Sequence, residues 1–139
     1  MARWLVKSEP SVWSFDAQVA AGAKGTAWDG VRNHSAKLNL MAMKRGEEAF
    51  FYHSNEGKEI VGIVKVVKTF YPDPGDPKGV FGMVDFAAVR RLAKPVGLAL
   101  AKATPALAKM ALVANSRLSV QPVTDEEWTT VLALAGEGR

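Results

Sequence analysis

The stretch WDGVRNHSAKLNLMAMKRGEEAFFYHSN, residues 28–55, is the most informative part of the chain about its fold. It predicts one helix over 34–45 and one strand over 48–54, with polar and aromatic residues at both ends of the unit. Asn33 is well suited to cap the helix, because its side-chain oxygen can accept a backbone N–H from the first turn. Gly46 follows the helix and is typical of a helix end. Polar and aromatic groups crowded at the ends of elements indicate the rim of a pocket.

The segments on either side of this unit predict further strands joined by helices. Long apolar runs over 60–71 and 80–93 indicate strands buried on both faces, and Gly62 inside the first predicts a bulge or a close backbone approach. The other predicted elements are a strand over 3–10 ended by Pro10, a helix over 15–21 capped by Ser14, two helical pieces within 95–115 broken at Thr104-Pro105, a strand over 116–123, and a last helix through 128–135 opened by a capping box at 124–127.

These elements predict a single α+β domain over 1–139 whose five or so strands curl into a barrel-like sheet. Helices do not alternate regularly with strands, so a dinucleotide-binding Rossmann domain is disfavoured. In the last strand we expect Val120 to point inward and Gln121 to lie on the other face. Trp4, Trp13 and Trp128 are expected in the core, whereas Trp28 fits either the core or a pocket wall.

The composition narrows the function further. The chain has 139 residues, 18 Lys and Arg against 14 Asp and Glu, a net charge of +4 and a pI near 9.5, which fits an anionic partner such as nucleic acid. It has no cysteine, which excludes disulfides and a thiol nucleophile, and two histidines argue against a histidine-rich metal site. No apolar run approaches the ~18–20 residues of a membrane span, and no secretory signal is recognised, so we expect a cytoplasmic location.

The sequence gives little support for catalysis. No serine lies in a Gly-x-Ser-x-Gly elbow, and GAKGTA, residues 22–27, lacks the Gly-Lys-Ser/Thr ending of a phosphate-binding loop. Asp73 and Asp76 together with Glu9 could bind Mg²⁺, but aspartates between prolines more often form turns. We therefore expect no catalytic residue, no metal and no cofactor.

Four polar and aromatic clusters at predicted element ends favour binding instead. Trp28 and Tyr52 are flat surfaces on which a base can stack, and Lys7, Arg32 and Arg117 could hold phosphates at the rim. The simpler alternatives are that Asn33 is only a helix cap and that Lys7 and Arg32 are solvated charges. The four clusters are Lys7-Ser8-Glu9, the segment 28–33, Tyr52-His53-Ser54, and Arg117-Leu118-Ser119.

At these clusters the chain resembles the EVE-domain family. The matching pieces come in the order WLVKSEP (4–10), WDGVRNHSAK (28–37), FYHSN (51–55), IVGIVKVVKTFYPDP (60–74) and RLSVQPVTDEEW (117–128). The resemblance implies a PUA-like fold, a curled β-barrel of five or six strands flanked by helices and related to the YTH and ASCH domains. His34 departs from the aromatic residue that the family often has there, and Lys37 from its arginine; both bear on base preference rather than on binding itself.

The resemblance also implies a non-catalytic module that holds a modified base, in particular modified cytosine in DNA, after flipping it from the helix. A module for modified RNA, and a nuclease or glycosylase acting on the same base, are the alternatives. A monomer is expected, working alone or with a restriction or modification partner protein. The implied base-binding residues are Lys7, Ser8, Glu9, Trp28, Val31, Arg32, Asn33, Tyr52, His53, Ser54, Pro72, Asp73, Arg117 and Ser119.

Overall fold

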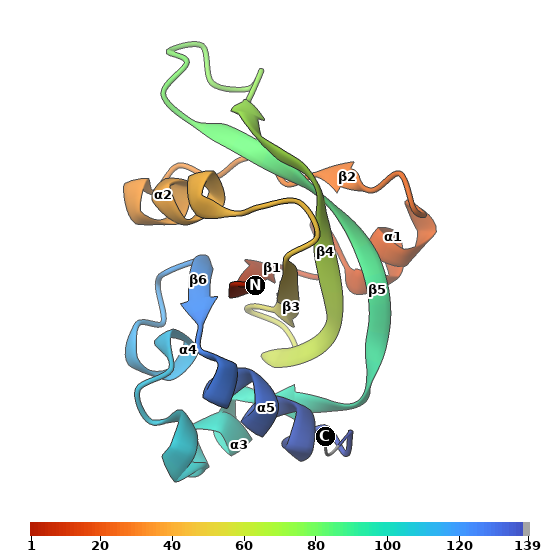
Figure 1. Cartoon of the computed structure of the whole chain (residues 1–139), viewed down its shortest axis with the longest axis vertical. Helices are drawn as coiled ribbons and strands as arrows, with labels where there is room; N and C mark the ends of the chain where they lie inside the picture. Colours follow the sequence, from red (N-terminus) through yellow and green to blue (C-terminus); the bar gives the residue numbers. More distant parts are fainter. Residues whose placement is uncertain (138–139) are drawn as a thin grey trace.

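Six strands form one curled sheet in the order β2-β5-β4-β3-β1-β6 in the computed structural model, which describes residues 1–137 (Figure 1). Among these six described strands, β1 and β3 pair in parallel and the other neighbours are antiparallel. The sheet does not close, yet its strong curl and its helices confirm the predicted α+β class. The strands are β1 (Arg3–Ser8), β2 (Thr26–Ala27), β3 (Glu48–His53), β4 (Glu59–Pro72), β5 (Gly82–Gly97) and β6 (Val120–Val123).

Helices cover the sheet in two groups. In Figure 1, α1 and α2 lie beside the upper part of the sheet, and α3, α4 and α5 gather at its lower end. The helices are α1 (Phe15–Ala20), α2 (His34–Ala42), α3 (Leu98–Ala103), the short 3₁₀ turn η1 (Pro105–Leu107), α4 (Ala111–Ala114) and α5 (Asp125–Leu134). Within residues 1–137, none of these helices has the length and apolar character needed to cross a bilayer.

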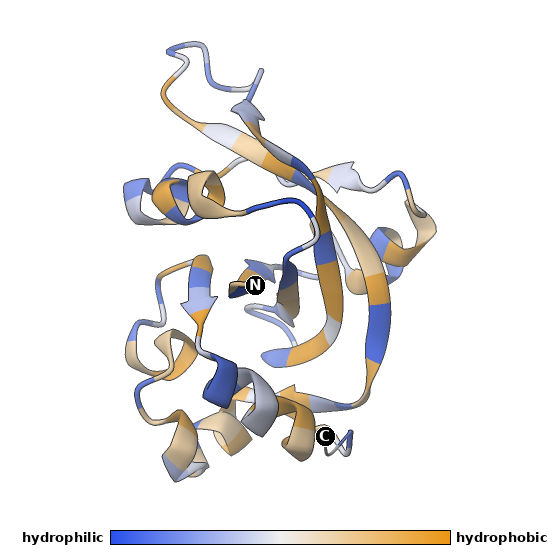
Figure 2. Cartoon of the chain, viewed as in Figure 1, coloured by the Kyte–Doolittle hydropathy of each residue, from blue (hydrophilic) through white to orange (hydrophobic). Residues whose placement is uncertain are grey.

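The two helix groups bury two apolar clusters, one on each face of β3. Phe51 belongs to the cluster under α1 and α2, and its neighbour Phe50 to the cluster under α3, α4 and α5. Successive side chains of a strand point to opposite faces, so these two phenylalanines join the two halves of the core. Figure 2 shows hydrophobic residues along the strands and more hydrophilic residues in several of the loops.

The predicted helix caps are confirmed. Asn33 accepts from Ala36 N at 2.9 Å, Ser14 accepts from Ala17 N at 3.1 Å, and Thr124 forms a capping box with Glu127. Helix α2 nevertheless ends at Ala42, three residues before its predicted end. The cause lies beyond the helix: Met43 turns extended to bury its side chain, and Lys44 N donates to the buried carboxylate of Glu47 at 2.9 Å.

Three other expectations were wrong in detail. The segment 95–97, predicted helical, continues β5 because Val96 and Gly97 pair with Ile60 and Glu59 of β4. Strand β6 begins only at Val120, later than predicted. Gln121 follows Val120 in this strand and so points to the other face, but that face is buried as well, and Gln121 Nε2 donates to Leu118 O at 2.8 Å. Trp13 is only partly buried.

Candidate nucleic-acid interface

A cavity of about 340 Å³ opens where the end of β1, the 9–13 turn and β2 approach one another. This volume is within the ~300–1,000 Å³ of typical small-ligand sites. Two tryptophans, a serine, a threonine, a lysine and an aspartate line it, so residues that can stack a planar ring and hydrogen-bond its edge stand together there. The residues that line it are Lys7, Ser8, Val12, Trp13, Thr26, Ala27, Trp28 and Asp29; we call it the Trp28 cavity.

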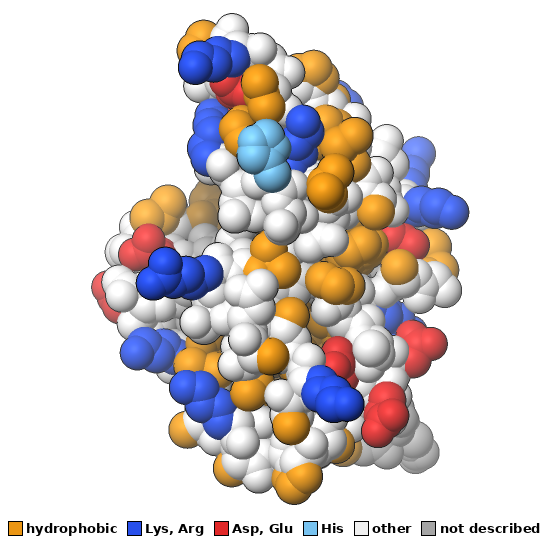
Figure 3. Space-filling view, turned by 90° about the vertical axis from the view of Figure 1, so that its left-hand side faces the viewer, with side chains coloured by type: hydrophobic (Ala, Val, Ile, Leu, Met, Phe, Trp, Pro, Cys, Tyr) orange, Lys and Arg blue, Asp and Glu red, His pale blue; other side chains and the backbone are white. Residues whose placement is uncertain are grey.

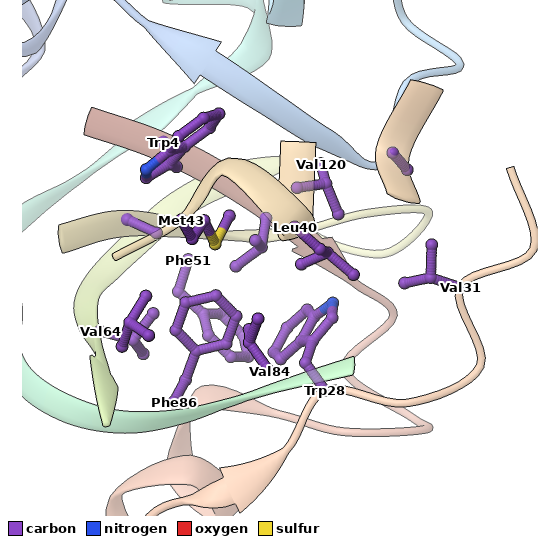
Figure 4. Packing of buried hydrophobic residues seen from close by; sticks show 14 of the residues in the cluster. Trp4, Trp28, Val31, Leu40, Met43, Phe51, Val64, Val84, Phe86 and Val120 are labelled. Carbon is purple, nitrogen blue, oxygen red and sulfur yellow. The ribbon is translucent and has the colours of Figure 1, made fainter. Parts of the chain in front are cut away.

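Trp28 is both a wall of this cavity and a member of the core. Its side chain is 8% exposed, and its ring meets Phe51 and Phe86 edge-on at centroid distances of 5.4 and 5.5 Å. Its backbone N–H donates to Val84 O at 2.7 Å, which fixes the segment against β5. Figure 4 shows the ring among Leu40, Val84 and Phe86. Trp28 therefore has both roles that the sequence left open, as a core residue and as a wall of the cavity.

The end of β1 contributes the polar wall. Ser8 Oγ donates to Trp13 O at 2.7 Å and so holds the 9–13 turn beside the cavity. Lys7 Nζ donates to Ser116 O at 2.7 Å, and partial burial lowers the pKa of Lys7. The Lys7 backbone N–H donates to Ser119 O at 3.0 Å, which brings the predicted 117–119 cluster beside β1.

Tyr52 and Ser54 line a second cavity of about 240 Å³, which shares Lys7 with the first. Lys7 Nζ lies 5.8 Å from the centroid of the Tyr52 ring, and burial raises the pKa of the Tyr52 hydroxyl. Lys58 also lines this cavity, so its wall combines an aromatic ring with two ammonium groups. Lys7 thus lines both cavities.

Asn33 and Arg117 meet at a third, smaller hollow of about 80 Å³ with Ser35, Asn115 and Leu118. The Asn33 oxygen is occupied by the cap of α2, as the simpler alternative from the sequence supposed. Neither Asn33 nor Arg117 is among the residues that line the Trp28 cavity.

Asp73 ties the loop after β4 to the segment 28–33. Its buried carboxylate accepts from Gly30 N at 3.0 Å, Gly75 N at 2.7 Å and Arg32 Nη1 at 3.0 Å. The bond from Gly30, then those from Gly75 and Arg32, lower the pKa of Asp73 despite its burial. Val31 packs in the core and Pro72 ends β4. Asp73 therefore holds the segment 28–33 against the loop after β4, and Arg32 keeps a partly exposed guanidinium beside it.

His53 and Glu9 hold neighbouring segments. His53 Nε2 accepts from Phe15 N at 3.1 Å at the start of α1, and burial lowers the pKa of this imidazole. Glu9 Oε1 accepts from Asn55 Nδ2 at 3.2 Å. Neither residue lines the cavities described above.

Of the residues singled out in the sequence, Lys7, Ser8 and Trp28 meet in the Trp28 cavity, and the sequence missed Trp13, Thr26 and Asp29. Trp13 had been assigned to the core. Asp29 had a signal, because it is the only carboxylate in the cluster 28–33.

The model of the EVE domain matches residues 2–134. The chain belongs to the EVE-domain family. Human thymocyte nuclear protein 1 (THYN1) is 38% identical over 96% of this chain and 73% of its own length. The crystal structure of human THYN1 in complex with DNA containing 5-methylcytosine superposes with a TM-score of 0.91 at 38% identity, over 97% of this chain and 98% of that one.

A bacterial structure, that of Rpa0253 from Rhodopseudomonas palustris, is similar to this EVE domain as well. It is 62% identical with a TM-score of 0.93, over 98% of this chain and 94% of that one. An ASCH protein of Zymomonas mobilis shares only the fold, at 10% identity and a TM-score of 0.60, over 95% of this chain and 97% of that one. The relation to ASCH domains implied by the sequence is confirmed at the level of fold.

Proposed function

We propose that this EVE domain is a reader of modified cytosine in DNA, which holds the flipped base in the Trp28 cavity without chemical conversion. The observation that carries the proposal is the likeness over almost the whole chain to THYN1, whose structure is a complex with 5-methylcytosine DNA. The cavity supports it, because two tryptophans and several polar groups converge there. The net charge of +4 favours a polyanionic partner.

For such a reader, the cost of flipping the base and the gain from stacking it are both a few kcal/mol. A base inside a duplex must be flipped out to enter a cavity, which costs a few kcal/mol. Stacking on an aromatic ring returns ~1–3 kcal/mol per base. A methyl group on cytosine contributes only about 0.8 kcal/mol of burial, so the cavity must also recognise the edge of the base.

Asp29 is the residue that we propose reads this edge. Cytosine carries an amino group at position 4, and a carboxylate accepts a hydrogen bond from it. In thymine an oxygen replaces that amino group, so its lone pairs would face the carboxylate. Within residues 1–137, no hydrogen bond or ion pair occupies the Asp29 carboxylate, which leaves it open to a ligand.

The test compares three bases in otherwise identical single-stranded oligonucleotides: 5-methylcytosine, cytosine and thymine. Since 5-methylcytosine and thymine both carry the methyl group, their affinity ratio isolates recognition of the edge. We expect Asp29→Asn to reduce that ratio by a factor of roughly 5 to 150, the equivalent of ~1–3 kcal/mol. Glu126→Gln on α5, which removes the same charge away from the cavity, is the control and should keep the ratio.

Equal binding of all three bases by the unaltered protein would contradict the reader function. An unchanged ratio in Asp29→Asn would contradict only the role of Asp29. Duplex DNA and RNA with the same modification, tested in parallel, distinguish the DNA reader from the RNA alternative. Mass spectrometry of the oligonucleotides after incubation with and without Mg²⁺ tests the nuclease and glycosylase alternatives, for which we expect intact DNA.

The monomeric state, the restriction or modification partner and the cytoplasmic location stay predictions. The curated relative is by name a nuclear protein. Sedimentation with and without DNA would test the monomer.

A further inference from the structure

The loop of residues 73–81 between β4 and β5 projects from the sheet at the top of Figure 1. Its shape is fixed by its own carboxylates. Asp76 accepts from Lys78 N, Val80 N and Phe81 N at 3.0, 2.9 and 2.7 Å, and Asp73 accepts from Gly75 N at 2.7 Å. A loop with this many internal bonds is a preformed structure, which we call the arm.

The arm is also anchored beside the Trp28 cavity. Asp29 lines the cavity, and the next residue, Gly30, donates its N–H to Asp73 at 3.0 Å. The arm therefore keeps a fixed position relative to whatever enters the cavity.

A cluster of basic groups surrounds the aromatic ring at the base of the arm. The Phe81 ring centroid lies 5.1 Å from that of His34, 5.8 Å from the Arg32 guanidinium carbon and 5.9 Å from Lys37 Nζ. Lys78 lies exposed on the arm itself. Figure 3 shows Lys and Arg side chains together with a histidine and hydrophobic groups over the upper part of this face. Backbone N–H groups occupy the Asp76 carboxylate, and Gly30 N, Gly75 N and the Arg32 guanidinium occupy that of Asp73. Lys37, Lys78 and the exposed part of the Arg32 guanidinium are therefore the cationic groups left to meet a ligand.

We propose that Arg32, His34, Lys37, Lys78 and Phe81, here called the arm surface, bind the phosphodiester backbone of a DNA duplex next to the flipped nucleotide. The proposal rests on the proposed function for where the DNA lies. Phosphate contacts fix the register and orientation of a protein on DNA. A rigid arm one residue away from the cavity wall can set where the cavity meets the strand, and its phosphate contacts offset part of the cost of flipping. None of these contacts distinguishes one base from another.

The experiment compares Lys37→Ala/Lys78→Ala with Lys102→Ala/Lys109→Ala, a control that removes the same charge from exposed lysines of α3 and the segment before α4, at the opposite end of the molecule. Affinities for duplexes with and without one 5-methylcytosine are measured from about 50 to about 200 mM salt. Each lost phosphate contact reduces the salt slope by about 0.9, so over this range the unaltered protein should lose about 12-fold more affinity than the arm variant. The ratio between modified and unmodified DNA should stay the same.

A second part of the experiment uses duplexes shortened on one side of the modified base. Removing the phosphates that the arm surface contacts should weaken binding by the unaltered protein and by the control, but not further by the arm variant. Equal salt slopes in Lys37→Ala/Lys78→Ala and in the control would contradict DNA binding by the arm surface and would leave the proposed reader function intact. Salt-sensitive binding through the arm with no preference for the modified base would retain the arm surface and overturn the reader. No binding of duplex DNA at all would overturn both.

Discussion

Trp28 shows how one residue can serve the core and the cavity together. Because its ring is 8% exposed and packs against Phe51 and Phe86, truncation leaves a void in the core. We expect Trp28→Ala to reduce the free energy of unfolding by ~3–5 kcal/mol. Trp13→Ala is the matched variant, since Trp13 lines the same cavity but is only partly buried.

The two tryptophan variants separate the two roles when thermal melting and oligonucleotide affinity are both measured. Trp13→Ala should retain most of the stability and, if the base stacks there, lose ~1–3 kcal/mol of affinity. Trp28→Ala with an unchanged melting temperature would show that the ring is not needed for packing. Trp13→Ala with unchanged affinity would exclude Trp13 as a stacking surface.

Local rules predicted the roles of some residues and long-range contacts decided others. The caps of Ser14, Asn33 and Thr124 follow from side chains that reach backbone groups three residues away, so the sequence sufficed. The position of Asp73 depends on Gly30, 43 residues earlier in the chain, and no local pattern encodes that contact. The same holds for His53, whose ring caps α1 from a distant strand instead of facing the cavity.

Element boundaries followed the same division. Helix α2 and strands β3 and β4 were predicted from apolar periodicity, but the early end of α2 depends on buried Glu47 and the extension of β5 on its pairing with β4. The predicted irregularity at Gly62 is confirmed, because the pairing of β4 with β5 shifts register between Ile60 and Gly62. The sequence could not show why a glycine is needed at this position, which is that the ring of Phe15 packs against it.

That close approach gives a prediction for the sheet. A Cβ on Gly62 would lie 2.3 Å from Phe15 Cζ, and Phe15 is fully buried, so its ring cannot easily move aside. We expect Gly62→Ala to destabilise the fold by about 1–3 kcal/mol through overpacking. Gly97→Ala is the control, since a Cβ there meets nothing within 4 Å. Urea unfolding checks the difference, and equal midpoints for the two variants would contradict the packing argument.

At the scale of the whole molecule, acid should lower the free energy of unfolding in two stages. Burial lowers the pKa of His53 below 6.5, so below that value the unfolded chain binds more protons than the folded one. The contribution of His53 to stability is therefore fully present above about pH 6.5 and is lost as the pH decreases through the folded-state pKa of His53. Protonation also removes the acceptor at Nε2 that receives Phe15 N–H.

The second stage belongs to the carboxylates. Hydrogen bonds lower the pKa of Glu47 below 4.5 and that of Asp73 below 3.8, against the opposing effect of burial. Their contribution to stability is present above those values and is lost as the pH decreases through the folded-state pKa values. The two stages thus occupy separate pH ranges, with the histidine first.

His53→Gln tests the first stage, because glutamine can accept a hydrogen bond but does not titrate. Melting temperatures are measured from about pH 7.5 to about pH 3. In the unaltered protein the melting temperature should start to decrease once the pH is below about 6.5, and in the variant it should start to decrease only at lower pH. His34→Gln is the control: it leaves the contact between His53 and Phe15 intact and should retain the early decrease. An early decrease that persists in His53→Gln would assign it to another group and reduce His53 to an uncharged helix cap.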